Sequence, residues 1–255
     1  MQSYLEKILV CPRCQTPIGP KSLSGKCRNC QFLYKKEGGI WHLFYTKDEE
    51  TKRSQKTYDR EHLKVFDGPT DGSYEVLAAI ARGNRTVDIA CGDGFIEEFA
   101  PETVAVEFSK NALLNAKQKG AKYLVLADAH HLPFVDNAFG VSISTGNLEQ
   151  FANPQQAINE MVRVSKVQVI TAHREFNIPF APQIRKIFTL ATRLKEQPIE
   201  RPIKQKDLEG MIKKTGVRII YKGLWTIPVN EGQVVKFLPE FKNIPACFFV
   251  ITLKK

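Results

Sequence analysis

Short apolar runs alternate with polar, turn-forming segments along most of this 255-residue chain. Each run is about as long as a strand, and several of the intervening segments carry apolar residues at helical spacing. This alternation predicts an α/β fold in which helices cover both faces of a mainly parallel sheet. The expected strands are residues 86–91, 103–107, 123–127, 140–145, 167–172, 217–224 and 246–253.

Polar residues mark where the helices between these strands should begin. Ser73, Ser109 and Asp207 precede apolar stripes and are typical N-cap residues, because their side-chain oxygens accept hydrogen bonds from free backbone N–H groups. Residues 46–66 are strongly polar and helix-prone, which predicts either a linker helix or a helix that folds over a ligand site. Further helices are expected at residues 95–100, 110–119 and 154–164.

Residues 1–45 contain four of the six cysteines, in two Cys-x-x-Cys pairs formed by Cys11 and Cys14 and by Cys27 and Cys30. This spacing is typical of a zinc ribbon, in which four thiolates surround one zinc ion at about 2.3 Å. The Pro- and Gly-rich tract between the pairs suits a fold that metal binding stabilises. Disulfides fit poorly with a cytosolic chain, and a redox role for one pair leaves the other unexplained. We therefore expect structural zinc and a ribbon whose core is separate from that of the α/β domain.

The composition is that of a soluble globular protein, with 43% hydrophobic residues. No apolar run approaches the roughly 18–20 residues that a membrane helix needs, and the first ten residues lack the apolar core of a signal peptide. We expect a cytoplasmic protein that does not associate with membranes.

Charge is unevenly distributed along the chain. Residues 1–60 carry 12 Lys and Arg against 6 Asp and Glu, and residues 163–222 carry 14 against 5. The stretch between them is acidic, with 7 basic and 14 acidic residues. Two basic blocks around an acidic one favour a polyanionic partner, for which RNA is the leading hypothesis, although a solvated surface gives the same pattern. The second block includes a predicted basic amphipathic helix at 182–195, inside a lid-like insert at 174–203.

Glycines and acids stand at the ends of the first three predicted strands. The first strand stops at Cys91-Gly92-Asp93-Gly94, just before a predicted helix start. A strand, a Gly-x-Gly turn and a helix N-terminus form a place for the polar part of a ligand at the carboxyl edge of a sheet. The second strand ends at Glu107, a position where a carboxylate can accept both hydroxyls of a ribose. The third is followed by Asp128-Ala129 and then by Leu132-Pro133-Phe134.

This ordered set of motifs, over about residues 74–224, resembles the class I S-adenosylmethionine (SAM)-dependent methyltransferases. The resemblance implies a seven-stranded Rossmann-like sheet, with Glu107 on the ribose hydroxyls and Asp128 on the adenine amino group. It further places Asp88 near the methionine ammonium. Ala90 departs from the family, which usually has glycine there. The full set of residues that it implies for the cofactor is Asp88, Ala90, Gly92, Gly94, Glu107, Asp128, Ala129 and Thr145.

The loop after the fourth strand faces the transferred methyl group in this superfamily. Asn147 and Glu149 are therefore our candidates for orienting a methyl acceptor, although capping of the helix at Pro154 is an equally good role for them. His130 and His131, which follow Asp128, are expected to be a solvated pair, and the alternative is a metal-ligand or general-base role.

The N-terminal segment loosely resembles the zinc ribbon of bacterial methyltransferases that modify a guanine of large-subunit ribosomal RNA. Those enzymes have Cys-x-x-x-His in the second half of the site, where this chain has Cys27-x-x-Cys30, so their substrate is not carried over. The sequence predicts a zinc ribbon at 1–45, a linker or cofactor-covering helix at 46–72 and a methyltransferase domain at 73–255. The favoured activity is methylation of an rRNA or tRNA base. The alternatives are a small-molecule methyltransferase and a non-catalytic scaffold.

Overall fold

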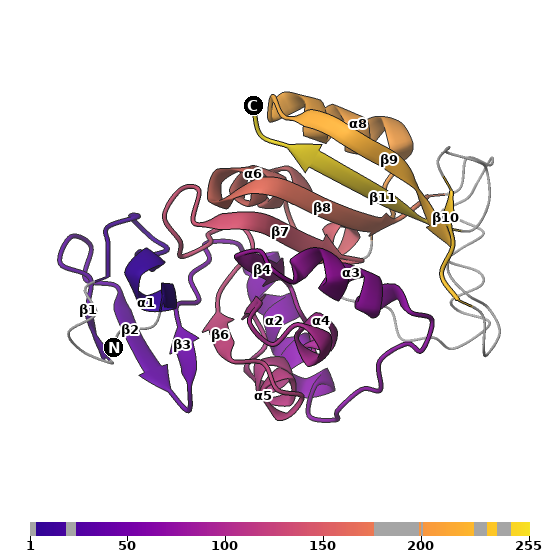
Figure 1. The fold of residues 1–255 in the computed structure, drawn as a ribbon. Coiled ribbons are helices and arrows are strands. Elements are labelled where there is room, and N and C mark those ends of the chain that lie inside the picture. Colours follow the sequence, from indigo (N-terminus) through magenta and orange to yellow (C-terminus); the bar gives the residue numbers. More distant parts are fainter. Residues whose placement is uncertain (1–3, 19–23, 176–198, 200, 227–233, 239–245) are drawn as a thin grey trace.

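The computed structural model describes residues 4–18, 24–175, 199, 201–226, 234–238 and 246–255 (Figure 1). Its helices are α1 (Tyr4–Ile8), α2 (Glu49–Glu61), α3 (Ser73–Ala81), α4 (Phe95–Phe99), α5 (Lys110–Gln118), α6 (Pro154–Val164) and α8 (Gln205–Lys214). Its strands are β1 (Ser24–Lys26), β2 (Leu33–Glu37), β3 (Ile40–His42), β4 (Thr86–Ile89), β5 (Val104–Glu107), β6 (Tyr123–Leu126), β7 (Phe139–Thr145), β8 (Ser165–His173), β9 (Arg218–Thr226), β10 (Phe237–Leu238) and β11 (Ala246–Leu253). The expected helix 182–195 lies outside the described residues, as does most of the expected insert at 174–203.

The described strands form one sheet in the order β1-β2-β3-β6-β5-β4-β7-β8-β11-β9-β10. Strands β6, β5, β4, β7 and β8 run parallel, and β11 lies antiparallel between β8 and β9. The seven strands predicted from the hydrophobic pattern are thus confirmed, and they form the expected α/β sheet from β6 to β9. The carboxyl ends of β4, β5, β6 and β7 meet at one edge of this sheet, so the predicted motifs come together.

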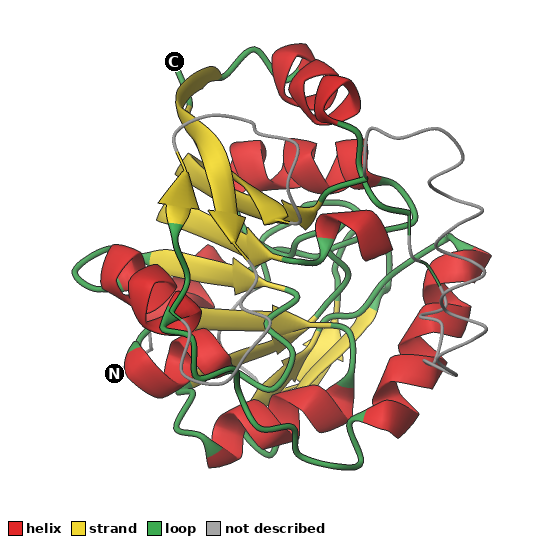
Figure 2. Cartoon of the chain, turned by 90° about the vertical axis from the view of Figure 1, so that its right-hand side faces the viewer, coloured by secondary structure: helices red, strands yellow, loops and turns green. Residues whose placement is uncertain are grey.

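Helices pack on both sides of the strands (Figure 2). On one face, Leu77 of α3 and Ile96 of α4 share an apolar cluster with Ile143 of β7. On the other face, Ile158 of α6 and Leu208 of α8 belong to the main core cluster. Burial of these side chains stabilises each helix against the sheet by about 1.5–3 kcal/mol per large residue. Among the described residues, no helix is long and apolar enough to cross a bilayer.

Three predicted helix caps have different outcomes. The Ser109 side chain accepts a hydrogen bond from the Ala112 backbone N–H, which confirms it as the N-cap of α5. The other two predictions are wrong. Gly72, with φ of 80°, is the N-cap of α3, because the chain enters that helix through a left-handed residue. Lys204 is the N-cap of α8, and Asp207 lies in the first turn, where the helix dipole also favours an acid.

The N-terminal ribbon is built into the main sheet. Strand β3 pairs in parallel with β6, with Trp41 opposite Val125, and Leu9 forms a β-bridge with Phe134. Leu9 and Trp41 belong to the same buried cluster as residues of β4 and β5. The expectation of a separate ribbon core is therefore wrong, because the pairing of β3 with β6 makes the two cores continuous. The domain boundaries at residues 45 and 72 remain predictions.

Candidate active site

The turn after β4 has a backbone conformation that favours glycine. Ala90, Gly92 and Gly94 have φ values of 60°, 55° and 79°. A Cβ added at Gly94 would lie 2.6 Å from the Cβ of Ala116, so α5 could not pack against this turn if the residue were larger. Ala90 is left-handed without being glycine, and its N–H still donates to Val106 O at 2.8 Å. Ala90 therefore accepts local backbone strain while keeping its hydrogen bond to β5.

Glu107 ends β5 with a buried carboxylate that accepts three backbone hydrogen bonds. Its Oε1 accepts from the N–H groups of Phe108 and Ser109 at 2.8 and 2.9 Å, and its Oε2 accepts from Gly92 at 3.2 Å. Burial raises the pKa of Glu107 above its usual value, and the bonds from Ser109 and Gly92 oppose this shift. The carboxylate is thereby fixed in place beside the glycine turn.

Asp128, just after β6, is held by His130. Asp128 Oδ1 accepts from the His130 backbone N–H at 3.0 Å and lies 2.6 Å from His130 Nδ1. Because His130 Nε2 accepts from the Asn153 N–H at 3.1 Å, the proton of the neutral ring sits on Nδ1 and is donated to Asp128. His130 is only 7% exposed, so the expectation of a solvated pair is wrong for this residue. Asp128 Oδ2 is buried and has no hydrogen-bond partner among the described residues.

A cavity of about 190 Å³ lies at this edge of the sheet. Its walls come from the ends of β4, β5 and β6, from the loop after β7, and from α2. Of the predicted cofactor residues, five line it: Ala90, Gly92, Glu107, Asp128 and Ala129. The remaining lining residues are Thr51, Ser54, Tyr58, His62, Val106, Phe108, Ala127, His130, Asn147, Gln150, Phe151, Ala152 and Ile199.

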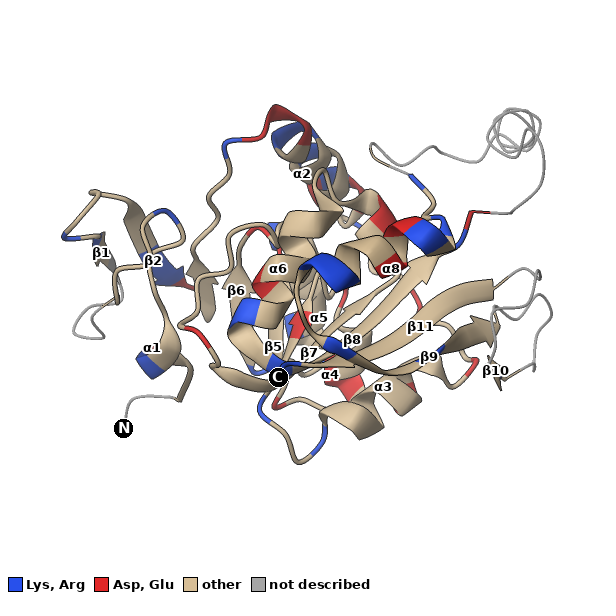
Figure 3. Ribbon diagram, turned by 90° about the horizontal axis from the view of Figure 1, so that it is seen from above, with Lys and Arg blue, Asp and Glu red and all other residues tan. Residues whose placement is uncertain are grey.

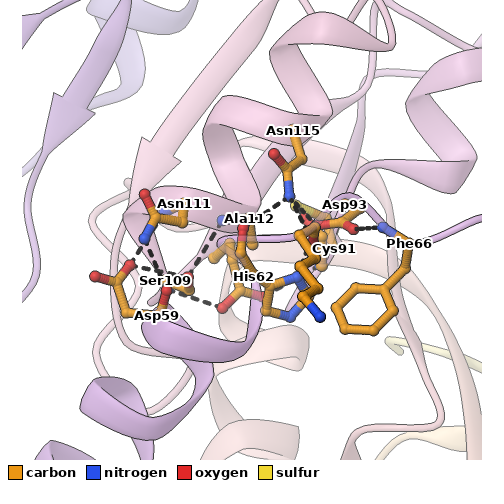
Figure 4. Close-up of polar contacts among 12 residues, drawn as sticks. Asp59, His62, Phe66, Cys91, Asp93, Ser109, Asn111, Ala112 and Asn115 are labelled. Atoms are coloured by element: carbon orange, nitrogen blue, oxygen red, sulfur yellow. Dashed lines mark hydrogen bonds and ion pairs between the residues drawn. The ribbon is translucent and has the colours of Figure 1, made fainter.

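Helix α2 covers the cavity and is anchored to the core along its length. Near its middle, Gln55 Nε2 donates to Phe108 O at 3.0 Å, and Tyr58 Oη donates to Gln150 Oε1 at 2.7 Å. At its end, Asp59 Oδ1 accepts from Ser109 Oγ at 3.0 Å (Figure 4). The sequence left open whether this segment was a linker or a cover, and in the structure it forms one wall of the cavity.

Asp93, the residue between the two glycines of the turn, also holds the end of α2. Its Oδ1 lies 2.7 Å from His62 Nδ1 and accepts from Asn115 Nδ2 at 3.0 Å, and its Oδ2 accepts from the Phe66 N–H at 2.8 Å (Figure 4). Burial opposes the charge of His62, but the hydrogen bond and charge of Asp93 outweigh burial and raise the His62 pKa. The Asp93 side chain thus faces the C-terminal end of α2, not the cavity.

Two further acids lie beneath the turn. Asp88 of β4 is buried, and burial, followed by the charge of Glu107, raises its pKa to about 8. Glu97 of α4 is fully buried, and neither carboxylate oxygen has a hydrogen-bond partner in the part of the chain that the structure describes. Burial and then the charge of Asp88 raise the Glu97 pKa well above its usual value. Neither residue is among those that line the cavity.

The two acceptor-site candidates have different surroundings. Asn147 lines the cavity, and its Nδ2 donates to Ala90 O at 2.9 Å, so it also supports the left-handed turn. Glu149 is fully buried and outside the cavity lining, and its Oε1 lies 2.6 Å from Nδ1 of His173, whose side chain is about half-exposed at 48%. Cys247 on the adjacent strand and then Glu149 raise the His173 pKa to about 10. Gly94 and Thr145 are likewise absent from the cavity wall.

Sequence reasoning allowed α2 to cover the site but did not identify its cavity-facing residues. Thr51, Ser54, Tyr58 and His62 follow one another at intervals of three or four residues, which is one face of a helix. These residues are polar or aromatic, although the helix as a whole has low hydrophobicity. This stripe is the feature of the sequence from which a cavity-facing side of α2 could have been predicted. The anchors that turn the stripe toward the cavity come from β5, α5 and the glycine turn, which are distant in sequence.

The four N-terminal cysteines form a second candidate site. Their sulfur atoms all lie within 4.8 Å of one another, with Cys11 to Cys30 and Cys14 to Cys27 both at 3.5 Å. A tetrahedral ion about 2.3 Å from each sulfur needs sulfurs about 3.8 Å apart. The cluster therefore fits a tetrahedral metal such as zinc.

Comparisons with known proteins agree with this geometry. Residues 87–171 match the model of a methyltransferase domain family. A SAM-dependent methyltransferase of Thermotoga maritima has a TM-score of 0.58 at 16% identity, covering 80% of this chain and 95% of that one. The magnesium protoporphyrin IX methyltransferase of Synechocystis, with bound SAH, has a TM-score of 0.55 at 11% identity, covering 82% and 100%. The fold is that of class I methyltransferases.

Each of two curated relatives matches less than half of the chain. A demethylmenaquinone methyltransferase of Paenarthrobacter aurescens is 31% identical over 112 residues, which are 42% of this chain and 44% of the relative. A malonyl-[acyl-carrier protein] O-methyltransferase of Buchnera aphidicola is 36% identical over 85 residues, or 31% and 34%. The chain thus spans less than half the length of these relatives.

Proposed function

We propose that this chain is a SAM-dependent methyltransferase that binds its cofactor in the cavity under α2. The observation that carries the proposal is the buried, unpartnered Oδ2 of Asp128 in the cavity wall. A buried acceptor without a partner costs about 1–3 kcal/mol, which the amino group of an adenine would recover. The position of Asp128 at the end of β6 is the one at which the family resemblance places that contact.

The other cavity residues fit the rest of the cofactor. Glu107, fixed by three backbone donors, has lone pairs left for the ribose hydroxyls. Ala90 and Gly92 bring the main chain to the cavity, Ala129 offers a backbone contact, and Asp88 of β4 remains the candidate neighbour of the methionine ammonium. Bound SAM supplies a methyl group on a sulfonium, and the protein's main task is to align an acceptor with it. Asn147, which lines the cavity, is our candidate for that alignment, and Glu149, which does not line it, would act through its contact with His173.

Titration calorimetry with SAM and with its product S-adenosylhomocysteine (SAH) tests the cofactor proposal. Asp128→Ala is expected to weaken binding by about 1–3 kcal/mol, the cost of losing a hydrogen bond to a buried partner. Asp136→Ala is the matched control, since the Asp136 side chain is 70% exposed and pairs with Arg163 away from the cavity. Wild-type protein that binds neither ligand would reject the proposal.

We propose a small organic acceptor as the first candidate and RNA as the second. The small-molecule proposal is supported by the relatives, whose names give demethylmenaquinone and a malonyl group carried on acyl-carrier protein as substrates. RNA is favoured by the basic blocks, and Figure 3 shows Lys and Arg residues on α1 and β2 of the ribbon and on α8. Two ribbon lysines are already paired, however, Lys36 with Glu6 at 3.2 Å and Lys35 with Glu37 at 2.8 Å. This pairing reduces the charge left for a phosphate backbone.

Methyl-labelled SAM distinguishes the two acceptor classes. The protein is incubated with labelled SAM and a cell extract, and the extract is then divided into ribonuclease-sensitive precipitate and solvent-extractable small molecules. Label in the extractable fraction supports the first candidate, and label in the precipitate supports the second. RNA binding, if it occurs, should weaken steeply with salt, by about 0.7–0.9 decades in affinity per phosphate contact for each decade of salt.

A further inference from the structure

Two buried hydroxyl groups lie on the cavity side of α2. Thr51 and Ser54 are 3% and 2% exposed, and both line the cavity. Their oxygens, Thr51 Oγ1 and Ser54 Oγ, are buried and have no hydrogen-bond partner among the described residues. A buried hydroxyl without a partner is costly, so an unsatisfied pair on one helix face requires an explanation.

Helical hydroxyls usually solve this problem within the helix. A Ser or Thr in a helix can donate to the backbone carbonyl one turn earlier, and Thr57 of α2 does so, with Oγ1 donating to Arg53 O at 3.3 Å. Thr51 and Ser54 do not make that bond. The half-buried Thr57 hydroxyl is satisfied within the helix, whereas the two hydroxyls that face the cavity are left for a partner inside it.

The position of α2 is set by contacts that do not involve these hydroxyls. The Asp48 side chain accepts from the Thr51 backbone N–H at 2.7 Å and caps the helix, while Tyr58 and Asp59 anchor its second half. The helix is therefore held over the cavity by its cap and its far end. The Ser54 hydroxyl takes no part in these anchoring contacts, and the Thr51 hydroxyl lies beside the Asp48 cap without a hydrogen bond of good geometry.

The order of residues along α2 indicates which part of a ligand each would meet. Thr51 also lines the neighbouring cavity with His130 and Asn153, which places it at the Asp128 end. His62, at the other end, lies near enough to Glu107 for that charge to raise its pKa. Ser54 lies one turn from Thr51 toward that second end. The helix thus runs from the adenine end of the cavity toward the ribose end.

We propose that Thr51 and Ser54 donate hydrogen bonds to the adenosine part of SAM, so that α2 contributes to recognition of the adenine ring. The chemistry is complementary, because Asp128 Oδ2 accepts from the adenine amino group while hydroxyls can donate to the ring nitrogens. This inference rests on the proposed cofactor function and adds two binding residues to it.

Calorimetry with SAH on Thr51→Val and Ser54→Ala tests the inference. Each variant should bind SAH about three- to tenfold more weakly, the usual effect of one neutral hydrogen bond. Thr57→Val is the matched control on the same helix and should bind normally, and Thr51→Ser should restore affinity because it keeps the hydroxyl. Affinities of both test variants within twofold of wild type would overturn the inference while leaving the cofactor proposal intact. Wild type that fails to bind SAH would overturn both.

Two further measurements separate ligand contact from a structural role. Without ligand, both variants should melt no lower than wild type, because each loses an unsatisfied buried hydroxyl, whereas the increase in Tm on adding SAH should shrink. A lower ligand-free Tm with an unchanged increase would instead show a structural role. SAH analogues that lack N1, N3 or N7 of the ring then identify the accepting nitrogen. If a hydroxyl donates to that nitrogen, its analogue should bind wild type more weakly than SAH does. The variant without that hydroxyl should bind the analogue and SAH equally well. Additive losses for all three analogues would overturn the ring contact.

Discussion

Oδ1 of Asp93 lies 2.7 Å from Nδ1 of His62 and so joins the glycine turn of the candidate cofactor site to the end of the helix that covers it. The same carboxylate accepts from Asn115 of α5 and from the Phe66 N–H, so it ties the segment that follows α2 to α5. The turn therefore has two functions in one tripeptide: Gly92 faces the cavity, and Asp93 holds its cover.

His62→Gln should remove a pH-dependent part of the stability. The His62 pKa is raised in the folded protein, because Asp93 outweighs the opposing effect of burial. The stabilisation is therefore fully present below the unfolded pKa of about 6.5 and is lost as pH rises through the folded pKa. We expect His62→Gln to cost about 1–2 kcal/mol at pH 6 and less at pH 9, measured by urea unfolding. His131→Gln serves as the control, and an equal loss at both pH values would contradict the prediction.

Glu97→Gln should have the opposite effect on stability at high pH. Burial raises the Glu97 pKa, so the folded state binds a proton that the unfolded chain releases above about pH 4.3. Wild-type stability should therefore fall as pH rises from there toward the folded pKa, and the variant should escape this loss. We expect the variant to be more stable at pH 8 by on the order of 1 kcal/mol, with little difference at pH 4. The exposed neighbour provides the control, since Glu98→Gln should show no such divergence.

Local sequence patterns were sufficient for the sheet and for the ends of its strands. Each strand from β4 to β8 carries its own apolar run, and the glycine turn, Glu107 and Asp128 follow from strand ends that meet at one edge. The pairing of β3 with β6 could not be read in the same way, because no periodicity specifies which distant strand lies at a sheet edge. The cover formed by α2 depends on Asp59 and His62 meeting partners about 30–50 residues away, which local propensity does not encode.

The burial of His130 likewise depends on contacts that local sequence patterns do not predict. A histidine pair in a polar loop usually faces solvent, but here Asp128 and Asn153 occupy both ring nitrogens of the first one. Asn153 also caps α6, so the contact depends on where that helix begins. Only the three-dimensional placement of α6 makes His130 a support for the predicted adenine-binding carboxylate.

Ala90→Gly should stabilise the protein. Ala90 has φ of 60°, a left-handed conformation that costs an L-residue roughly 1–2 kcal/mol and glycine almost nothing. Part of this gain is offset by the greater freedom of glycine in the unfolded chain, which leaves about 0.5–1 kcal/mol. Chemical denaturation of the variant measures the difference. Ala105→Gly in β5 is a useful contrast, because the same change at a buried strand position should destabilise; a loss of stability in Ala90→Gly would show that the turn is not strained.

Metal binding at the cysteine cluster should control the stability of the whole chain. We expect one zinc per chain by elemental analysis, and Cys27→Ser should lose it because a tetrahedral site needs all four thiolates. Structural zinc sites supply folding free energy directly, so metal removal should destabilise whatever packs against the ribbon. That partner is the α/β core, because β3 pairs with β6. The chain reaches Asp128 two residues after the end of β6.

Metal-free protein and Cys27→Ser should therefore unfold in a single transition at a lower Tm and bind SAH more weakly. Cys247→Ser, which changes a buried thiol outside the cluster, should keep its zinc and serves as the control. If metal-free protein instead melted in two steps, with the later step and SAH affinity unchanged, the ribbon and the cofactor site would be independent. The parallel pairing of β3 with β6 would then not couple the stability of the metal site to that of the cofactor site. The shared burial of Trp41 and Val125 in one core cluster is the physical reason to expect the single transition.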